Sequence, residues 1–229
     1  MRNSIIIGAA VSVLAGPAGA EMTTIGLNSY SVTASDFDGS VLTLNIIDMY
    51  LLSDDEGDVL LNIYNLDLPA AAQLPYFQSF TGTGWQPSNL GGPFDSAALR
   101  LADSFVTIGG FDFANPEQAP GAGAGTGLDP NFGGNNASHP GLLAGWYNGS
   151  PPSLGGQVGD TPLGLGVLIA RFSSTQELGG GNFAGTTLEA TWNQGLGTPG
   201  IQAEFLVMPT PGSLALLGIA GLGRTRRRG

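Results

Sequence analysis

Alternating apolar and polar positions along the middle of the chain predict β-strands. Successive side chains of a strand point to opposite faces of a sheet, so a half-buried strand repeats its apolar residues every second position. This pattern predicts strands at 25–33, 41–52, 59–63, 105–108, 111–113, 165–172, 188–192 and 201–207. In the strongest of them, one face collects Leu42, Leu44, Ile46, Tyr50 and Leu52. In the following strand, one side is lined by Val59, Leu61 and Ile63.

The segments between these strands add three expectations. The acidic turn 54–57 is short enough to join strands 41–52 and 59–63 as a hairpin. A short helix is predicted at 96–103, where alanines and leucines follow Ser96 as a possible cap. The segment 114–162 is rich in glycine, proline and asparagine, whereas ordinary connections have about 4 to 6 residues. We interpret it as either an elaborated functional loop or a mobile one.

The strand count and the composition together predict the fold class. Seven to nine short strands with one short helix indicate an all-β domain, a single antiparallel β-sandwich, with jelly-roll and immunoglobulin-like topologies both open. Glycine supplies 38 and proline 15 of the 229 residues, which disfavours long helices. We expect the sandwich to span residues 21–208, between two end segments of different character.

The first twenty residues are typical of a cleavable signal peptide. Arg2 gives a short positive beginning, and an apolar stretch follows from Ile5 to Leu14. Ala18 and Ala20 then match the small residues that signal peptidase requires around its cleavage site. We expect cleavage before Glu21, with signal peptidase as the first partner, rather than a retained membrane anchor.

The last twenty-one residues form a second unusual segment. Pro209, Thr210 and Pro211 predict an extended stretch, because proline fixes φ and lacks an amide donor. The uncharged run 212–223 would reach about 18 Å as a helix, against about 30 Å of bilayer hydrocarbon. A basic cluster then holds its end of the segment on the cytoplasmic side, and this cluster consists of Arg224, Arg226, Arg227 and Arg228.

This order of prolines, short apolar helix and terminal arginines resembles the PEP-CTERM sorting tail of bacterial surface proteins. The resemblance covers 209–229, about a tenth of the chain, and Thr210 stands where that family usually has glutamate. It implies that an exosortase-like enzyme recognises and cuts the tail after transient contact with the inner membrane. The alternative is a plain C-terminal anchor or an amphiphilic end that is not processed. The resemblance thus implies an exported protein that is displayed at the cell surface or released from it. We expect its role to be structural or adhesive rather than enzymatic, at the surface or in the extracellular matrix.

Charge and composition exclude several kinds of partner and site. The expected mature domain has no lysine, two arginines and eighteen acidic residues, a formal charge of −16. Such a surface repels the phosphates of nucleic acids, so nucleic-acid binding is excluded. The acids instead maintain solubility in a salty medium or attract divalent cations. No cysteine is present, which excludes disulfides and thiolate chemistry.

Candidate catalytic and metal-binding residues are few. The one histidine, His139, lies in a loop, and no Gly-x-Ser-x-Gly motif accompanies it, so we assign no catalytic residue. A pair of carboxylates could serve a glycoside hydrolase, which is our third hypothesis. The acidic turns 36–39 and 54–58 are candidates for Ca²⁺, but neither has EF-hand spacing, and solvated turns are the default interpretation. We therefore predict no cofactor, with calcium as the open alternative.

Aromatic residues in loops suggest a carbohydrate-binding module, perhaps assisted by calcium, as the second hypothesis. Trp85 and Trp146, with Tyr147 beside the latter, are flanked by glycines, and exposed aromatic rings bind extracellular polysaccharide in many secreted proteins. The other interpretation is that they are buried, because tryptophan buries a large area. Trp192, on an alternating face, is predicted to be core. The sequence at 136–138 also matches a glycosylation sequon.

Overall fold

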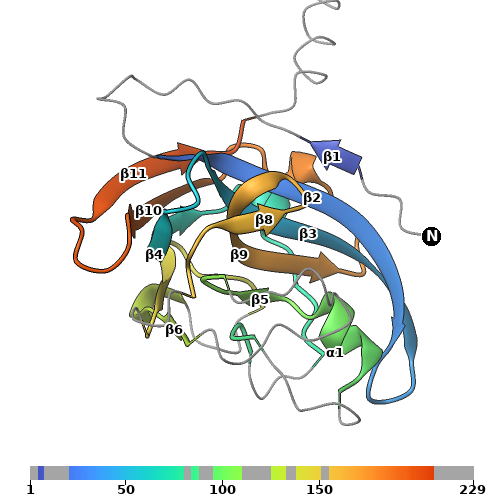
Figure 1. Cartoon of the computed structure of the whole chain (residues 1–229). Coiled ribbons are helices and arrows are strands. Elements are labelled where there is room, and N and C mark those ends of the chain that lie inside the picture. The colour runs from blue at the N-terminus through green and yellow to red at the C-terminus, as the bar shows by residue number, and fades with distance from the viewer. Residues whose placement is uncertain are drawn as a thin grey trace, which may run out of the picture.

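The computed structural model describes residues 5–7, 21–79, 84–87, 95–109, 125–132, 138–150 and 155–208. Two antiparallel sheets pack against each other in a sandwich-like arrangement (Figure 1). Sheet A has the strand order β1-β2-β3-β9-β5, with β8 also paired to β9, and sheet B has the order β11-β10-β4-β7-β6. The strands of sheet A are β1 (Ile5–Ile7), β2 (Met22–Ser35), β3 (Val41–Ser53), β5 (Phe105–Val106), β8 (Gly159–Thr161) and β9 (Gly164–Ser174). Those of sheet B are β4 (Val59–Asp67), β6 (Thr126–Leu128), β7 (Ala144–Asn148), β10 (Thr187–Asn193) and β11 (Ile201–Leu206).

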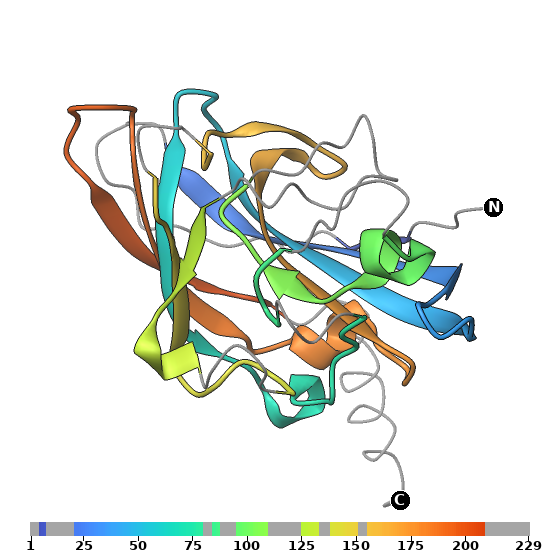
Figure 2. The ribbon, with the colours of Figure 1, turned by 90° about the horizontal axis from the view of Figure 1, so that it is seen from below.

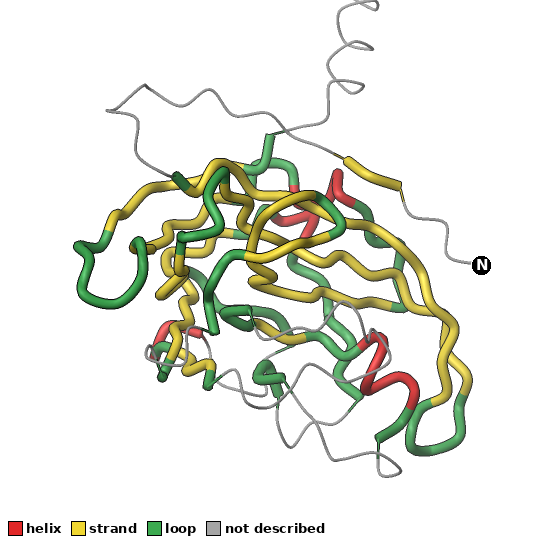
Figure 3. The backbone as a smooth tube through the Cα atoms, viewed as in Figure 1, coloured by secondary structure: helices red, strands yellow, loops and turns green. Residues whose placement is uncertain are grey.

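Short helical segments connect some of these strands. The one α-helix among the described residues is α1 (Ala97–Ala102), which Ser96 caps by accepting a 2.9 Å hydrogen bond from the Leu99 amide, as predicted. Single 3₁₀ turns occur at Ala70–Ala72, Pro130–Phe132 and Gly180–Phe183. Figure 3 shows strands in both layers and the β2–β3 hairpin extending past the end of β9. Within the described ranges, no helix has the length and apolar character needed to cross a membrane.

The main core lies between the sheets. Sheet A contributes inward-facing residues such as Leu27, Ile47 and Phe172, and sheet B contributes Leu188 and Trp192 among others. Burial of this apolar surface is the dominant favourable term in folding. The alternating faces predicted for β10 and β11 are confirmed, except that Ile201 at the start of β11 is exposed.

The predicted hairpin between residues 41–52 and 59–63 is wrong. β3 pairs with β2 and β9, whereas β4 pairs with β10 and β7, so the turn after β3 carries the chain from one sheet to the other. The physical reason is burial of β3 on both faces. Ile47 and Met49 face the main core, while Leu44 and Ile46 pack in a second cluster on the outer side of sheet A. A strand covered on both sides favours a central place in its own sheet.

The predicted face of β4 is also wrong in part. The core positions are Leu60, Ile63 and Leu66, rather than alternate residues from Val59. Register shifts lie between Leu60 and Asn62 and again between Ile63 and Leu66. A β-bulge inserts an extra residue, and each insertion exchanges the two faces, so strict alternation fails.

Helix α1, together with Phe77 from the segment after β4, covers part of the outer side of sheet A (Figure 2 shows the helix). Ala102 of α1 and Phe77 pack there against Tyr30 and Ile46. On the same side, Phe105 of β5 packs with Tyr50 of β3. The opposite side of the molecule differs, because no helix described by the structure covers the outer side of sheet B (Figure 2).

Candidate functional site

The tryptophans considered as sugar platforms belong to the core. Trp85 and Trp146 are 0% and 1% exposed, and Phe132 packs edge-on against both indole rings. Trp146 also donates a 2.9 Å hydrogen bond from Nε1 to the carbonyl of Thr107. The interpretation of these two residues as exposed platforms is therefore wrong, because their large rings gain more from core packing than their loop context indicates. Trp192 lies in the core, as predicted.

The carboxylates of the acidic turn between β2 and β3 accept hydrogen bonds within the turn, and Asp36 Oδ1 also accepts from the hydroxyls of Ser79 and Ser96. Asp38 Oδ1 accepts a 2.8 Å bond from the Ser40 amide, and hydrogen bonding from the side chain of Ser40, with a smaller part from this amide, lowers the pKa of Asp38. Asp36 Oδ1 accepts a 2.9 Å bond from the Phe37 amide. These are the backbone contacts for which turns favour aspartate. Throughout the described ranges, no three or more histidine, cysteine, aspartate or glutamate residues are grouped closely enough to hold a metal ion.

The second acidic turn, 54–58, makes hydrogen bonds to other parts of the domain. Asp58 is fully buried, which raises its pKa, and it accepts hydrogen bonds from Ser53 Oγ at 2.6 Å and from the side-chain amide of Gln194. Asp54 Oδ1 accepts a 2.9 Å bond from the Glu21 amide. The carboxylates thus hold the corner between the sheets and the start of β2 through hydrogen bonds.

His139 has a local role in the structure. Its side chain is half-buried, and Nδ1 lies 2.9 Å from the carbonyl oxygen of Pro140. Within the described part of the chain, this is the contact that its ring makes. The sequon residue Asn136 lies outside the described residues.

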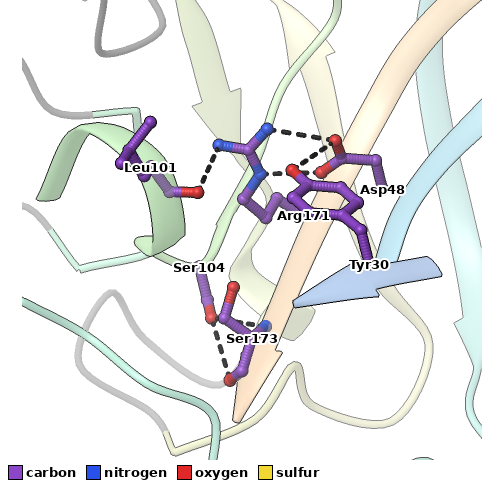
Figure 4. Close-up of polar contacts among 6 residues, drawn as sticks. All are labelled: Tyr30, Asp48, Leu101, Ser104, Arg171 and Ser173. Atoms are coloured by element: carbon purple, nitrogen blue, oxygen red, sulfur yellow. Dashed lines mark hydrogen bonds and ion pairs between the residues drawn. The ribbon is translucent and has the colours of Figure 1, made fainter. Parts of the chain in front are cut away.

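A buried ion pair joins the three central strands of sheet A beneath α1 (Figure 4). Arg171 Nε and Nη2 donate to the two carboxylate oxygens of Asp48 at 2.7 and 3.0 Å, and Tyr30 donates to Asp48 Oδ2 at 2.9 Å. Arg171 Nη1 donates to the carbonyl of Leu101 in α1 at 3.4 Å, and the guanidinium lies 5.3 Å from the ring centre of Phe105. A two-pronged arginine–carboxylate contact of this kind is strong and geometrically specific. The bond from Arg171 Nη1 to Leu101 connects α1 to this ion pair and so to the sheet.

A second buried carboxyl lies beside this pair. Asp103 Oδ1 accepts a 2.8 Å bond from the Ser79 amide, whereas its buried Oδ2 has no hydrogen-bond partner. Burial raises the pKa of Asp103 to about 8, and the nearby charge of Arg171 opposes that rise. The neutral acid is the form that suits such a site, because a buried charge costs more than a buried neutral group.

The two carboxyl groups give the hydrolase hypothesis no support. Asp48 and Asp103 are 3% and 2% exposed, so a sugar cannot reach them in this arrangement. Sequence reasoning did not identify Asp48 and Arg171 as a pair. The signal was present, because an arginine within an apolar strand pattern requires a buried partner, and Asp48 interrupts the strongest apolar strand.

The outer side of sheet B carries a continuous row of polar side chains. Cross-strand pairing aligns Gln202 of β11, Thr191 of β10, Asn62 of β4, Tyr147 of β7 and Gly127 of β6. Five strands spaced about 4.8 Å apart make this row about 19 Å long. A shorter parallel row places Tyr64 beside Glu189 and Glu204. We call this surface the open face, and its members are Asn62, Tyr64, Tyr147, Glu189, Thr191, Gln202 and Glu204.

Two amides orient the central carboxylate of the open face. Asn65 Nδ2 donates to Glu189 Oε1 at 2.6 Å, and Gln202 Nε2 donates to Oε2 at 3.1 Å. The bond from Asn65 is the main reason why the pKa of Glu189 is lowered. Glu189 is therefore an ionised, positioned acceptor on a solvent-facing sheet.

Tyr147 supplies the aromatic surface of the open face. Its side chain is 47% exposed, and its ring lies directly over Gly127. A β-carbon added at Gly127 would come within 2.4 Å of Tyr147 Cζ, so glycine is needed for the ring to lie there. Of the loop aromatics considered from the sequence, Tyr147 is the one that the structure exposes.

The open face combines an aromatic ring with amide, hydroxyl and carboxylate groups, which are groups that bind polyhydroxylated molecules, while Asn62 Oδ1 and the Tyr64 hydroxyl oxygen are themselves buried. The two arginines of the expected mature domain lie elsewhere, in α1 and β9. The alternation in β10 and β11 already indicated solvent-facing Glu189, Thr191, Gln202 and Glu204. The cross-strand register that adds Asn62, Tyr64 and Tyr147 could not be read from it.

Comparison with known proteins gives no assignment. No protein-family model matches the chain, and no match was found among curated proteins or solved structures. The expected processing residues 18–20 and 209–211 and the arginines of 224–228 lie outside the described residues, as do 111–113 and much of 114–162. The described parts of the segment 114–162 include β6, β7, β8 and the 3₁₀ turn Pro130–Phe132.

Proposed function

We propose that this chain is an exported bacterial protein of structural or adhesive type. Signal peptidase removes residues 1–20, and an exosortase-like enzyme sorts the chain through the tail 209–229 after transient contact with the inner membrane. The product is an acidic domain of residues 21–208, displayed at the cell surface or released into the extracellular matrix. The sequence features of the two ends are the basis of the proposal.

The hydrogen bond of the Glu21 backbone nitrogen is the main structural support for cleavage before Glu21. The first residue after the expected cut lies immediately before β2, and its backbone nitrogen is 2.9 Å from Asp54 Oδ1. Hydrolysis of the bond between Ala20 and Glu21 turns that nitrogen into an α-ammonium group. The new positive charge then faces a carboxylate, so the cut exchanges a neutral hydrogen bond for a charge-assisted one.

The other end of the domain agrees with this boundary. The amide of Val207 donates to the Thr186 carbonyl at 2.8 Å, and the Val207 side chain is buried. Met208 is 41% exposed. Residues beside both expected boundaries, Glu21 and Val207, therefore make contacts within the domain, which supports the proposed limits.

Cell fractionation tests the proposal. The full chain is expressed in its host beside two variants, one with Ala20→Lys and one with the four tail arginines changed to alanine. We expect the unchanged chain at the surface or in the medium, the Ala20→Lys chain uncleaved in the membrane fraction, and the arginine-free tail mis-sorted. Recovery of all three chains in the cytosol would overturn the proposal.

The open face favours a second candidate function, the binding of neutral polysaccharide. A half-exposed tyrosine ring next to a row of amides, hydroxyls and an oriented carboxylate suits the faces and hydroxyls of sugars. With two carboxylates and no basic residue, the face disfavours anionic polymers. Slower migration of the protein in native gels that contain a neutral glucan would support this function, and unchanged migration across a panel of neutral polysaccharides would count against it.

A further inference from the structure

The strand β2, which only the three-residue strand β1 separates from the edge of sheet A, has an unusual composition. The fourteen residues Met22–Ser35 include no charged residue and no proline. From Thr24 to Ser35 the strand pairs with β3 without a bulge. Edge strands of monomeric proteins are usually interrupted by charges, prolines or bulges, because their free amides and carbonyls bind other strands.

The edge of sheet B shows the usual protection. Its long edge strand β11 has six residues, carries Glu204 and begins two residues after Pro199. The opposite edge of sheet B is β6, which has only three residues. The long uncharged edge is therefore specific to β2, although the domain as a whole is strongly acidic.

β1 shows that this edge accepts an antiparallel strand. It pairs through Ile5↔Ser29, Ile6↔Asn28 and Ile7↔Leu27, and it lies beside β2 in Figure 1. These residues belong to the segment that the proposed function removes from the chain. The same cut that produces the mature domain takes β1 away and exposes the backbone of Leu27–Ser29.

We propose that the mature domain dimerises by pairing β2 with β2 of a second copy of this chain. This inference rests on the proposed removal of residues 1–20. The two strands run antiparallel about a two-fold axis at Asn28, which sets Leu27 of one copy opposite Ser29 of the other. Opposed residues of an antiparallel pair point to the same face, so sheet A continues from one copy into the next.

A second copy fits this edge better than an unrelated strand for two reasons. Two-fold pairing satisfies, in both copies at once, the backbone groups of Leu27–Ser29 that the cut exposes. Two domains of charge −16 repel each other over most of their surfaces, and β2 is a stretch where neither copy presents an acid. The interaction depends on backbone hydrogen bonds and is therefore less sensitive to salt than an ionic contact.

The test cuts the purified full chain in vitro, so it does not depend on processing by the host. Residues 14–20 are replaced by a site for a sequence-specific protease, and mass is measured by light scattering before and after the cut. We expect a monomer before the cut and, after it, twice the mass of the cut chain, which runs from the protease site to residue 229. The amides of Leu27–Ser29 should remain protected from hydrogen exchange in the dimer, because the second copy replaces β1.

Matched lysine variants identify the edge. The double variant Ser31→Lys, Thr33→Lys adds two positive charges at exposed positions of β2. The double variant Gln202→Lys, Leu206→Lys adds two positive charges at exposed positions of β11. The β2 variant should stay monomeric after the cut, whereas the β11 variant should dimerise like the unchanged chain. A cut chain that stays monomeric at its highest soluble concentration, a dimer already present before the cut, or a β2 variant that dimerises as well as the β11 variant would overturn the proposal.

Discussion

The outer sides of the two sheets differ in whether their central carboxylate is buried or faces solvent. On sheet A, α1 covers part of the outer side, and the Asp48 carboxylate has an arginine and a tyrosine as partners away from water. On sheet B, the Glu189 carboxylate faces solvent and is held by the side-chain amides of Asn65 and Gln202. Both carboxylates accept several hydrogen bonds, but only the first is closed to other molecules.

The difference follows from what covers each face. A carboxylate under a helix loses its hydration, so it needs a cation and fixed donors, and removal of either partner leaves a buried charge. A carboxylate on an open sheet keeps its water, so neutral amides are sufficient and a ligand can replace solvent. The covered face of sheet A thus contributes to stability, whereas the open face keeps its carboxylate accessible to solvent.

The largest predicted effect comes from breaking the buried ion pair. Arg171→Met leaves Asp48 charged and without its cation, and we expect the free energy of unfolding to fall by about 3–5 kcal/mol in urea denaturation. Changing both partners, with Asp48→Leu added, should restore most of the loss, because no uncompensated charge remains. Glu189→Gln is the control on the open face. If it destabilises as much as Arg171→Met, the contrast between the faces is wrong.

A smaller effect depends on pH and concerns Asp103. Burial raises its pKa from 3.8 to about 8, so the folded chain holds this proton more tightly than the unfolded chain. Its contribution is therefore most favourable below pH about 4 and is lost as the pH rises to about 8. Asp103→Asn keeps the acceptor for the Ser79 amide and removes the titration. The difference in melting temperature between variant and unchanged chain should move in favour of the variant across this range, and a constant difference would contradict it.

The smallest effect on stability is expected on the open face. Tyr147→Ala removes a ring that is 47% exposed, so the melting temperature should change little. Retardation by a neutral polysaccharide in native gels should be lost, because the ring is the main apolar surface of the row. Trp192→Phe, inside the core, is the comparison variant and should destabilise the domain while the retardation of its folded fraction persists. Undiminished binding by Tyr147→Ala would show that the open face is not the sugar site.

Local patterns in the sequence were sufficient for most of the longer strands and for α1, but not for β6, β7 and β8. The strands around 25–33, 41–52, 165–172, 188–192 and 201–207 and the helix at 96–103 are all present, because alternation and capping depend on neighbouring residues. Pairing was less predictable. Asp54–Gly57 has the composition of a hairpin turn, yet it joins the two sheets, because β3 is buried on both faces and β4 has bulges.

The candidate site was harder to predict than the fold. Trp85 and Trp146 lie in glycine-rich loops, and loop composition does not determine the direction in which a ring points. Tyr147 is exposed because it alternates with Trp146 on β7, and this follows only once β7 is known to be a strand. The row with Asn62 depends on the register between β4 and β7, which distant parts of the chain determine.

Intact mass of the protein recovered from the surface and medium of its host tests the central claim most directly. The account predicts a chain that begins at Glu21, with an ammonium group facing Asp54, and that ends within 209–211. A mass that includes both residues 1–20 and Gly229 would contradict it, because neither end would then be a removable signal.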